Sequence, residues 1–277
     1  QAVILGRQGG VGGTNPNILI NGDFRVNQRG FTSGGSVYPS AWAADRWVFA
    51  GDGSTATAAF TGAVGNRTAT LTRGNGTFVL ARNRIEARDL PPGEYTVSWS
   101  GDMLGRALPV GGSVPAAETS PFTFTADGTS DYEIRFSTAS ATGTLANVKV
   151  ERGAVATPFT PRPYAEELAL CQRYYQRFQA ESTNDRFGLG SAFSTTGARV
   201  LVPLLTRMRI GAPTLTFNDL RLADGVNVHA VSALTLSSTG GSNAHQVQAT
   251  STGLTQFRSY DLLANSTASY IAFDAEL

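Results

Sequence analysis

The sequence is poor in lysine, cysteine and histidine, and each scarcity excludes a class of site. Lys149 is the only lysine, so 21 of the 22 basic residues are arginine. Cys171 is the only cysteine, which rules out a disulfide within the chain and predicts a small buried hydrophobic residue. The two histidines, His229 and His245, lie in separate segments without the spacing of a zinc site. We therefore expect no metal centre built from these residues.

Charge and long apolar runs are also scarce. Charged residues make up 16% of the 277 residues and the net charge is +1, so we expect no nucleic-acid partner. No stretch of about 18 apolar residues occurs, so we expect no insertion into a membrane. The usual catalytic motifs, such as GxSxG and the P-loop, are missing, and no pair of acidic residues stands out as a glycosidase pair. These absences favour a binding or structural protein over an enzyme.

What the sequence does contain is a series of short strands separated by turns. Apolar residues alternate with polar ones in residues 67–72, 95–99, 132–136 and 145–150, and clusters of Gly, Asn, Asp and Pro lie between them. Several short strands at this spacing are typical of an antiparallel two-sheet fold. We therefore predict a jelly-roll β-sandwich over residues 17–156.

Two irregular segments delimit this predicted sandwich. Residues 1–16 are rich in glycine and are expected to form a flexible arm that attaches the protein to a partner. Residues 157–163 contain three prolines and are expected to form a semi-rigid linker. Residues 164–277 are predicted to form a C-terminal β-sandwich opened by one α-helix. The fold class expected for the whole chain is therefore all-β. The strands predicted in the second domain are 199–203, 214–217, 233–236 and 270–273.

The predicted helix that opens the second domain carries an apolar seam. Its members are spaced by four and three residues in alternation, and they are Tyr164, Leu168, Cys171, Tyr175 and Phe178. This spacing is typical of identical helices that pack around a common axis. Because one helix cannot bury such a stripe alone, we predict that the seam is the interface of a homo-oligomer.

Aromatic residues gather in the segment 38–47. Proteins bind sugars by stacking the sugar ring on an aromatic side chain while polar side chains donate hydrogen bonds to the hydroxyls. Tyr38, Trp42, Arg46 and Trp47 are therefore the candidate carbohydrate-binding residues. A second interpretation stays open, in which Trp47 begins a strand that enters the core and Asp45 and Arg46 anchor the preceding loop.

Several segments taken together resemble a known family. They are similar in order and spacing to the carbohydrate-binding-module-like jelly roll and the C-terminal domain found in bacteriophage tail fibres and related receptor-binding proteins. The similar segments are Asn17 to Phe24, Gln28 to Gly30, Trp42 to Trp47, Val148 to Gly153, Ala156 to Phe159, Arg162-Pro163, Glu166 to Tyr175, Pro203 to Thr214 and Phe273 to Leu277.

The resemblance implies a spike or fibre protein on a virion, or on a phage-derived particle such as a gene transfer agent. It implies adsorption to bacterial surface polysaccharide. We expect this binding, to capsule or lipopolysaccharide, to be non-enzymatic, and we expect sibling virion proteins to hold the N-terminal arm. It also implies a homo-oligomer, usually a trimer. The helical seam does not choose between three and five copies, so a pentamer, which would suit a capsid vertex, stays the alternative. The shortness of the chain suggests a head spike or a compact distal module. Two other functions stay open, namely a polysaccharide depolymerase and a purely structural decoration of the capsid or tail.

The segment Asn21-Gly22-Asp23-Phe24 also resembles the first strand of calcium-containing carbohydrate modules. In those modules acidic residues stand where this chain has Arg25 and Asn147. Calcium prefers several charged oxygen ligands, and an arginine places like charge beside the ion. We therefore expect no cofactor, and a structural calcium only as the weaker alternative.

Overall fold

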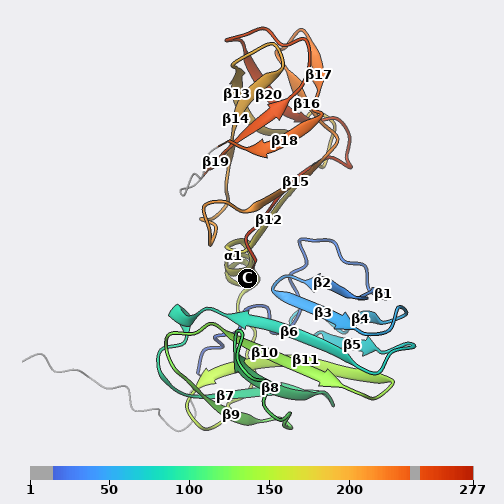
Figure 1. Cartoon of the computed structure of the whole chain (residues 1–277), viewed down its shortest axis with the longest axis vertical. Coiled ribbons are helices and arrows are strands. Elements are labelled where there is room, and N and C mark those ends of the chain that lie inside the picture. The colour runs from blue at the N-terminus through green and yellow to red at the C-terminus, as the bar shows by residue number, and fades with distance from the viewer. Residues whose placement is uncertain (1–14, 238–243, 277) are drawn as a thin grey trace, which may run out of the picture. The chain divides into compact units, whose positions relative to one another are not determined.

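The computed structural model describes residues 15–237 and 244–276, which form two compact units (Figure 1). Unit 1 contains residues 15–27 and 31–162, and unit 2 contains residues 28–30 together with the described residues from 163 onward. Nearly all regular structure in both units is antiparallel β-sheet, which confirms the predicted all-β class. Most of the predicted arm, residues 1–14, lies outside the described residues.

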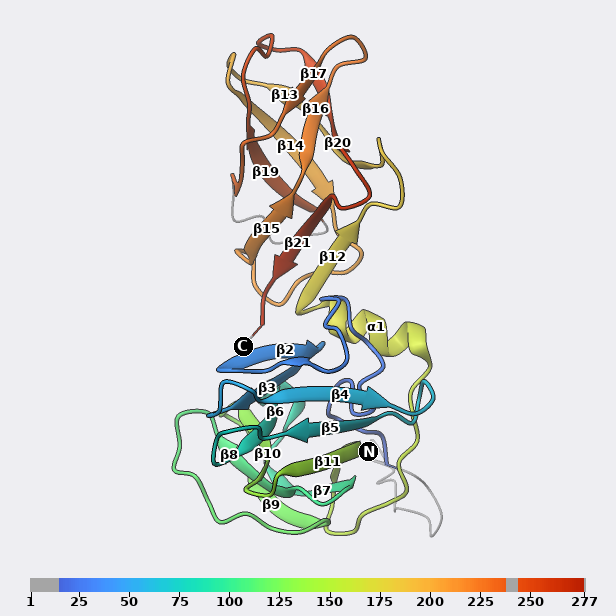
Figure 2. The same cartoon turned by 90° about the vertical axis from the view of Figure 1, so that its right-hand side faces the viewer.

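Unit 1 is a sandwich of a six-stranded and a five-stranded sheet (Figures 1 and 2). The chain passes repeatedly from one sheet to the other, as in a jelly roll. In spatial order the six-stranded sheet contains β1 (Gly35–Ser36), β4 (Thr57–Thr61), β5 (Thr68–Thr72), β11 (Thr142–Arg152), β7 (Gly93–Ser100) and β9 (Phe122–Ala126). The five-stranded sheet contains β2 (Ser40–Ala44), β3 (Trp47–Gly51), β6 (Val79–Ile85), β10 (Tyr132–Thr138) and β8 (Leu104–Pro109). A short 3₁₀ turn, η1 (Ala87–Asp89), follows β6.

The core between these sheets is built around aromatic rings. The ring centroids of Trp47 and Phe24 are 4.9 Å apart, and those of Trp99 and Phe136 are also 4.9 Å apart. Trp47 and Phe136 connect the two pairs at 6.1 Å. The side chains along β6 and β10 alternate because successive residues of a strand face opposite sides of the sheet. The inward-facing residues therefore fill the core, and the residues between them form the outer face.

The segment before β1 is fastened to the core by Asn21. Its side-chain amide donates to the carbonyl oxygens of Val26 and Asp45, at 2.9 and 2.8 Å, and its own side-chain oxygen accepts from the Val26 N–H. The next residue, Gly22, lies so close to β11 that an added Cβ would be 2.1 Å from the Val148 carbonyl oxygen. The Asn-Gly-Asp-Phe segment is therefore a structural turn that only glycine permits at its second position.

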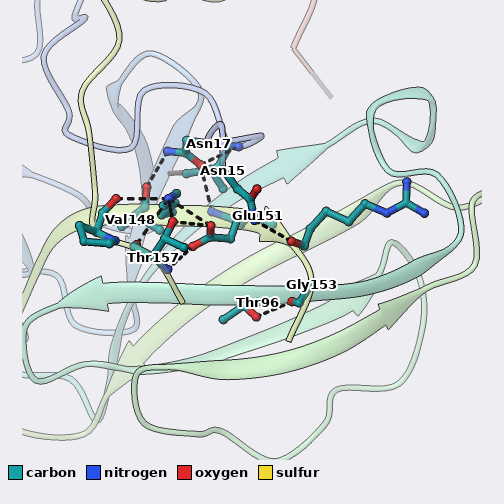
Figure 3. A network of polar contacts seen from close by, with 12 residues as sticks. Asn15, Asn17, Thr96, Val148, Glu151, Gly153 and Thr157 are labelled. Atoms are coloured by element: carbon teal, nitrogen blue, oxygen red, sulfur yellow. Dashed lines mark hydrogen bonds and ion pairs between the residues drawn. The ribbon is translucent and has the colours of Figure 1, made fainter. Parts of the chain in front are cut away.

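The segment predicted to be a linker is bound to unit 1 as far as residue 162. Figure 3 shows the contacts that hold its first part. The carboxylate of Glu151 accepts hydrogen bonds from the N–H and the hydroxyl of Thr157, at 2.7 and 2.6 Å. The buried Lys149 ammonium lies 3.2 Å from the same carboxylate and donates to the Thr157 hydroxyl at 2.5 Å. Residues 157–162 therefore belong to unit 1, and they carry neither helix nor strand, as expected of an extended segment.

Unit 2 contains a three-stranded and a seven-stranded sheet, with one α-helix, α1 (Tyr164–Gln172), at its start. The three-stranded sheet contains β12 (Tyr175–Gln179), β21 (Tyr270–Asp274) and β15 (Thr214–Asn218). The seven-stranded sheet contains β17 (Val228–Ala230), β16 (Leu220–Ala223), β20 (Ser259–Ala264), β13 (Arg186–Ala192), β14 (Gly197–Pro203), β19 (Ala244–Thr250) and β18 (Ala233–Leu236). In the described parts of the chain, no helix has the length and hydropathy needed to cross a membrane.

The predicted helical seam is wrong in its second half. Helix α1 ends at Gln172, so it holds only Tyr164, Leu168 and Cys171 of the seam. Tyr175 and Phe178 lie instead on β12, where they pair in register with Asp274 and Ile271 of β21. Aromatic residues favour strands, and pairing with β21 satisfies the backbone groups that a longer helix would have used.

The part of the seam that is helical does not form an exposed apolar stripe. Cys171 is buried, as predicted, whereas Tyr164 is 51% exposed and Leu168 is half-buried. The other buried side chain of α1 is Glu167, four residues before Cys171 and so on the same face of the helix. The homo-oligomer, with a trimer preferred over a pentamer, therefore stays a prediction that rests on the family resemblance.

His245 gives unit 2 an expected acid sensitivity. Its ring is 1% exposed, lies 5.1 Å from the Phe273 ring and makes no hydrogen bond to any described residue. Burial lowers the pKa of His245 below its usual value of 6.5. The unfolded chain therefore binds a proton that the folded chain does not, so stability is complete above about pH 6.5 and falls as the pH drops below it.

Replacing His245→Leu is expected to remove this part of the pH dependence. Thermal unfolding followed by circular dichroism between about pH 5 and 7.5 would measure it, because few other side chains titrate in that range. Equal slopes of melting temperature against pH in the variant and the original chain would contradict the assignment.

Candidate functional site

Two of the four candidate carbohydrate-binding residues are core residues. Trp47 is 0% exposed, and its indole N–H donates to the Asn21 carbonyl oxygen at 2.8 Å. Arg46 is 2% exposed, occupies the β2–β3 turn with a φ of 71° and donates to the Arg84 carbonyl oxygen at 2.6 Å. The prediction that Arg46 and Trp47 contact a sugar is therefore wrong, and the core-and-anchor interpretation of these residues is confirmed.

The other two candidates lie at the surface of unit 1. Tyr38 is 48% exposed, just before β2. Trp42 is partly exposed and lies on β2, which is an edge strand of the five-stranded sheet. It pairs in register with Val48, whereas its neighbour Ala43 belongs to the core. Trp42 therefore projects from the outer face of the five-stranded sheet.

The register of the sheet continues this line of side chains across all five strands. Val48 pairs with Arg82, Arg82 with Arg135, and Arg135 with Arg106. Directly paired residues face the same side of a sheet, and neighbouring strands lie about 4.8 Å apart, so the line from Trp42 to Arg106 spans about 19 Å. An aromatic side chain at one edge is thus followed by the aliphatic Val48 and then by three guanidinium groups in a row.

A second line lies beside the first and contains the only acidic residue of this cluster. Glu133 pairs with Arg84 across one strand boundary and with Leu108 across the other. The Glu133 Oε1 atom accepts two hydrogen bonds from Arg135, at 2.8 and 2.6 Å, and the Oε2 atom accepts one from Arg84 at 3.4 Å. Glu133 is 4% exposed, so arginine side chains enclose its carboxylate.

The four arginines differ in how firmly they are held. Arg82 reaches Glu133 only as an ion pair at 3.6 Å, which is longer than a hydrogen bond, and its side chain is 36% exposed. Arg106, at the far end of the row, donates to the Ser137 hydroxyl at 3.1 Å and to the Pro115 carbonyl oxygen at 3.4 Å. Burial, and secondly the charge of Arg135, lower the pKa of Arg106 below its usual value, because two cations share this end of the sheet.

We call the surface formed by Arg82, Arg84, Arg106 and Arg135 the arginine face. Each guanidinium carries five N–H donors in a planar fork, and one carboxylate with two oxygens satisfies few of them. Four guanidinium groups and one carboxylate leave an excess of three positive charges on a chain whose net charge is +1. The arrangement can bind an extended, oxygen-rich ligand that lies across the strands, with an aromatic ring at one end.

None of these arginines is among the residues predicted from the sequence to bind a ligand. A signal was present, because Arg82 and Arg84 are two residues apart on one strand, as are Glu133 and Arg135 on another. Such spacing places each pair on one face of its strand. What brings the pairs together is the order of strands β6, β10 and β8, which are distant in the sequence.

The residues considered for calcium make direct contacts with each other or with neighbouring side chains. The Arg25 guanidinium lies 2.7 Å from the buried carboxylate of Asp23, and the Asn147 amide donates to the Asn66 side-chain oxygen at 3.0 Å. Across residues 15–237 and 244–276, no three His, Cys, Asp or Glu side chains gather in a way that could hold a metal ion.

A second surface feature, besides the arginine face of unit 1, is a groove of about 750 Å³ on the seven-stranded sheet of unit 2. The groove runs beside Leu189 and Leu201, which are paired in register and are 61% and 55% exposed. Its polar contribution is the ion pair between Arg186 and Asp261, at 3.2 Å. A mostly aliphatic groove offers a sugar few hydrogen bonds, so the face of unit 1 is the better candidate site.

Comparison with known proteins gave no match, either to a model of a protein family or to a curated protein sequence.

Proposed function

We propose that this chain is a spike or fibre protein of a virion or phage-like particle, and that it adsorbs to bacterial surface polysaccharide through the outer face of the five-stranded sheet. Binding is non-enzymatic and reversible. The observation that carries the proposal is the line from Trp42 to Arg106, in which one aromatic ring and three guanidinium groups face the same side of a rigid sheet. The family resemblance supports the location on a virion.

The chemistry of this line suits a sugar chain. An indole ring offers a flat apolar platform for the C–H face of a sugar ring, and guanidinium groups donate several hydrogen bonds to hydroxyl or acidic oxygens. Because the sheet fixes the spacing of these groups before the ligand arrives, little conformational entropy is lost on binding.

Several copies of the chain on one particle would strengthen weak individual contacts. A homo-oligomer presents its glycan-binding faces at a high effective concentration, so avidity exceeds the affinity of one site. The proposed trimer and the N-terminal arm, as the attachment to sibling virion proteins, complete this arrangement.

Replacing Trp42→Ala is expected to weaken binding to extracted capsular polysaccharide or lipopolysaccharide by about tenfold, since aromatic anchors at binding sites commonly contribute 1–2 kcal/mol. Pull-down of the full chain on immobilised polysaccharide from a bacterium to which the particle adsorbs would measure the change. Phe257→Ala is the matched control, because Phe257 is an exposed ring of unit 2.

Three results would speak against the proposal. Unchanged binding by the Trp42→Ala variant would reject the site. Equal loss of binding by Trp42→Ala and Phe257→Ala would show that any exposed aromatic ring contributes to binding, whatever its place in the fold. New reducing ends or unsaturated sugars after incubation of the chain with the polysaccharide would favour a depolymerase.

A further inference from the structure

Resting on the proposed function, we infer that the arginine face selects acidic polysaccharides and binds the carboxylates of uronic-acid-type sugars. Arg82 is the principal contact of the four. The inference concerns the class of glycan and therefore goes beyond glycan binding itself.

The arginine face carries an excess of positive charge. Glu133 is its one enclosed carboxylate, and it interacts with Arg82, Arg84 and Arg135. The charged residues nearest along the chain are at η1, where Arg88 lies 3.2 Å from Glu86 and 3.6 Å from Asp89, and where Asp131 accepts a hydrogen bond from the Ala87 N–H at 2.8 Å. Arginine keeps its charge at all ordinary pH values, so this imbalance is permanent.

The arginine face already binds a carboxylate of its own, that of Glu133. The Nε and Nη2 atoms of Arg135 both donate to one oxygen of Glu133, at 2.8 and 2.6 Å. Guanidinium groups bind carboxylates by several charge-assisted hydrogen bonds at once, and here two of them meet on a single oxygen. Arg82 lies at the edge of the same cluster, partly exposed and without a hydrogen bond of normal length to Glu133, so it can present its fork to a second carboxylate supplied by a ligand.

The spacing of the guanidinium groups also favours an acidic sugar chain. Arg82, Arg135 and Arg106 occur in one row on three adjacent strands, so their Cα atoms follow one another at about 4.8 Å. A rigid row of cations fits an acidic sugar chain lying across the strands, because charges that recur along the chain meet cations in turn. Neutral sugars need no such row, since hydroxyl groups are bound well by amides and neutral side chains.

The test is a glycan array carrying uronic-acid-containing, sulfated and neutral oligosaccharides, probed with the full chain. Each bound uronic-acid glycan is then compared with its carboxyl-reduced form, which keeps the sugar backbone and loses the charge. We expect carboxyl reduction to abolish binding, and about 0.5 M salt to weaken it strongly. The variant Arg82→Gln is expected to bind about tenfold more weakly.

Matched variants separate this role from a loss of folding. Arg152→Gln makes the same charge change at an exposed residue on the six-stranded sheet, and we expect it to bind as the original chain does. Arg106→Gln tests the same row from its other end and is expected to weaken binding. Unchanged melting temperatures of the variants show that the effects are on binding.

The possible failures are distinguishable. Binding to neutral glycans alone would overturn the inference and leave the proposed function standing. Tighter binding to sulfated than to uronic-acid glycans would overturn the assignment to carboxylates. Binding to double-stranded DNA as tight as that to uronic-acid glycans would overturn it too. Equal losses in Arg82→Gln and Arg152→Gln would reject the arginine face as the site. Binding to no glycan on the array would reject the proposed function together with the inference.

Discussion

Replacing Trp47→Ala is expected to lower the free energy of unfolding of unit 1 by about 3–5 kcal/mol, the usual cost of removing a large aromatic side chain from a core. The Trp47 ring contacts the rings of Phe24, Phe49 and Phe136, and no neighbouring segment can move in to fill its volume without disturbing them. Chemical denaturation followed by circular dichroism would measure the loss.

The chain supplies a matched control for this prediction in Trp42. Trp42→Ala removes the same side chain five residues earlier, but from the outer face of the sheet, so we expect a loss of less than about 1 kcal/mol. A third variant, Trp47→Phe, keeps a ring and removes the indole hydrogen bond to Asn21, which should cost about 1–3 kcal/mol. Similar losses for Trp47→Ala and Trp42→Ala would contradict the different burial of the two residues.

The second large effect is expected at the buried ion pair between Lys149 and Glu151 on β11. Lys149 is 1% exposed and Glu151 is 0% exposed, with 3.2 Å between the ammonium nitrogen and the carboxylate oxygen. Replacing Lys149→Met leaves the Glu151 carboxylate buried without its cation. Breaking a buried pair in this way typically costs about 3–5 kcal/mol.

A double-mutant cycle tests the origin of that cost. Adding Glu151→Gln removes the unpaired charge and keeps an oxygen that can accept from the Thr157 N–H, so the double variant should be more stable than Lys149→Met alone. Arg88→Met is the control at an exposed ion pair, where we expect less than about 1 kcal/mol. If Lys149→Met and Arg88→Met had the same small effect, the ion pair would not stabilise the fold as described.

Much of unit 1 could be predicted because apolar and polar residues alternate within its strands, a signal that each strand carries in its own sequence. Residues 67–72, 95–99 and 132–136 alternate strictly, residues 145–150 alternate except at Leu145-Ala146, and each of these segments overlaps a strand of the sandwich. Trp99 is 7% exposed and packs edge-on against Phe136, as alternation with the inward-facing Val97 requires. The alternation of apolar and polar residues along a strand therefore indicates which of its side chains face inward.

The helix was predicted less well, because its end is decided far away in the sequence. The residues after Gln172 continue an apolar spacing that fits a helix, but β21, almost a hundred residues later, pairs with them and draws them into a sheet. Competition between a local pattern and a distant strand partner is invisible in one segment taken alone.

The candidate site was predicted in part for the same reason. Trp42 could be identified because aromatic residues gather in the segment 38–47. The arginines of β6, β10 and β8 meet only because the strands are neighbours in the sheet. Arg46 and Trp47 were misassigned because exposure cannot be inferred from proximity in the sequence. A tight turn directs Trp47 inward, although Trp42 on the paired strand faces outward.

The burial of Lys149 has a practical consequence for anyone who wishes to label or immobilise this molecule. With its single ε-amine enclosed by Glu151 and Thr157, the folded surface offers acylating dyes and aldehyde fixatives no lysine to attack. Coupling chemistry aimed at carboxyl groups would reach the surface instead, and a lysine introduced at the surface by mutation would be its one reactive lysine side chain.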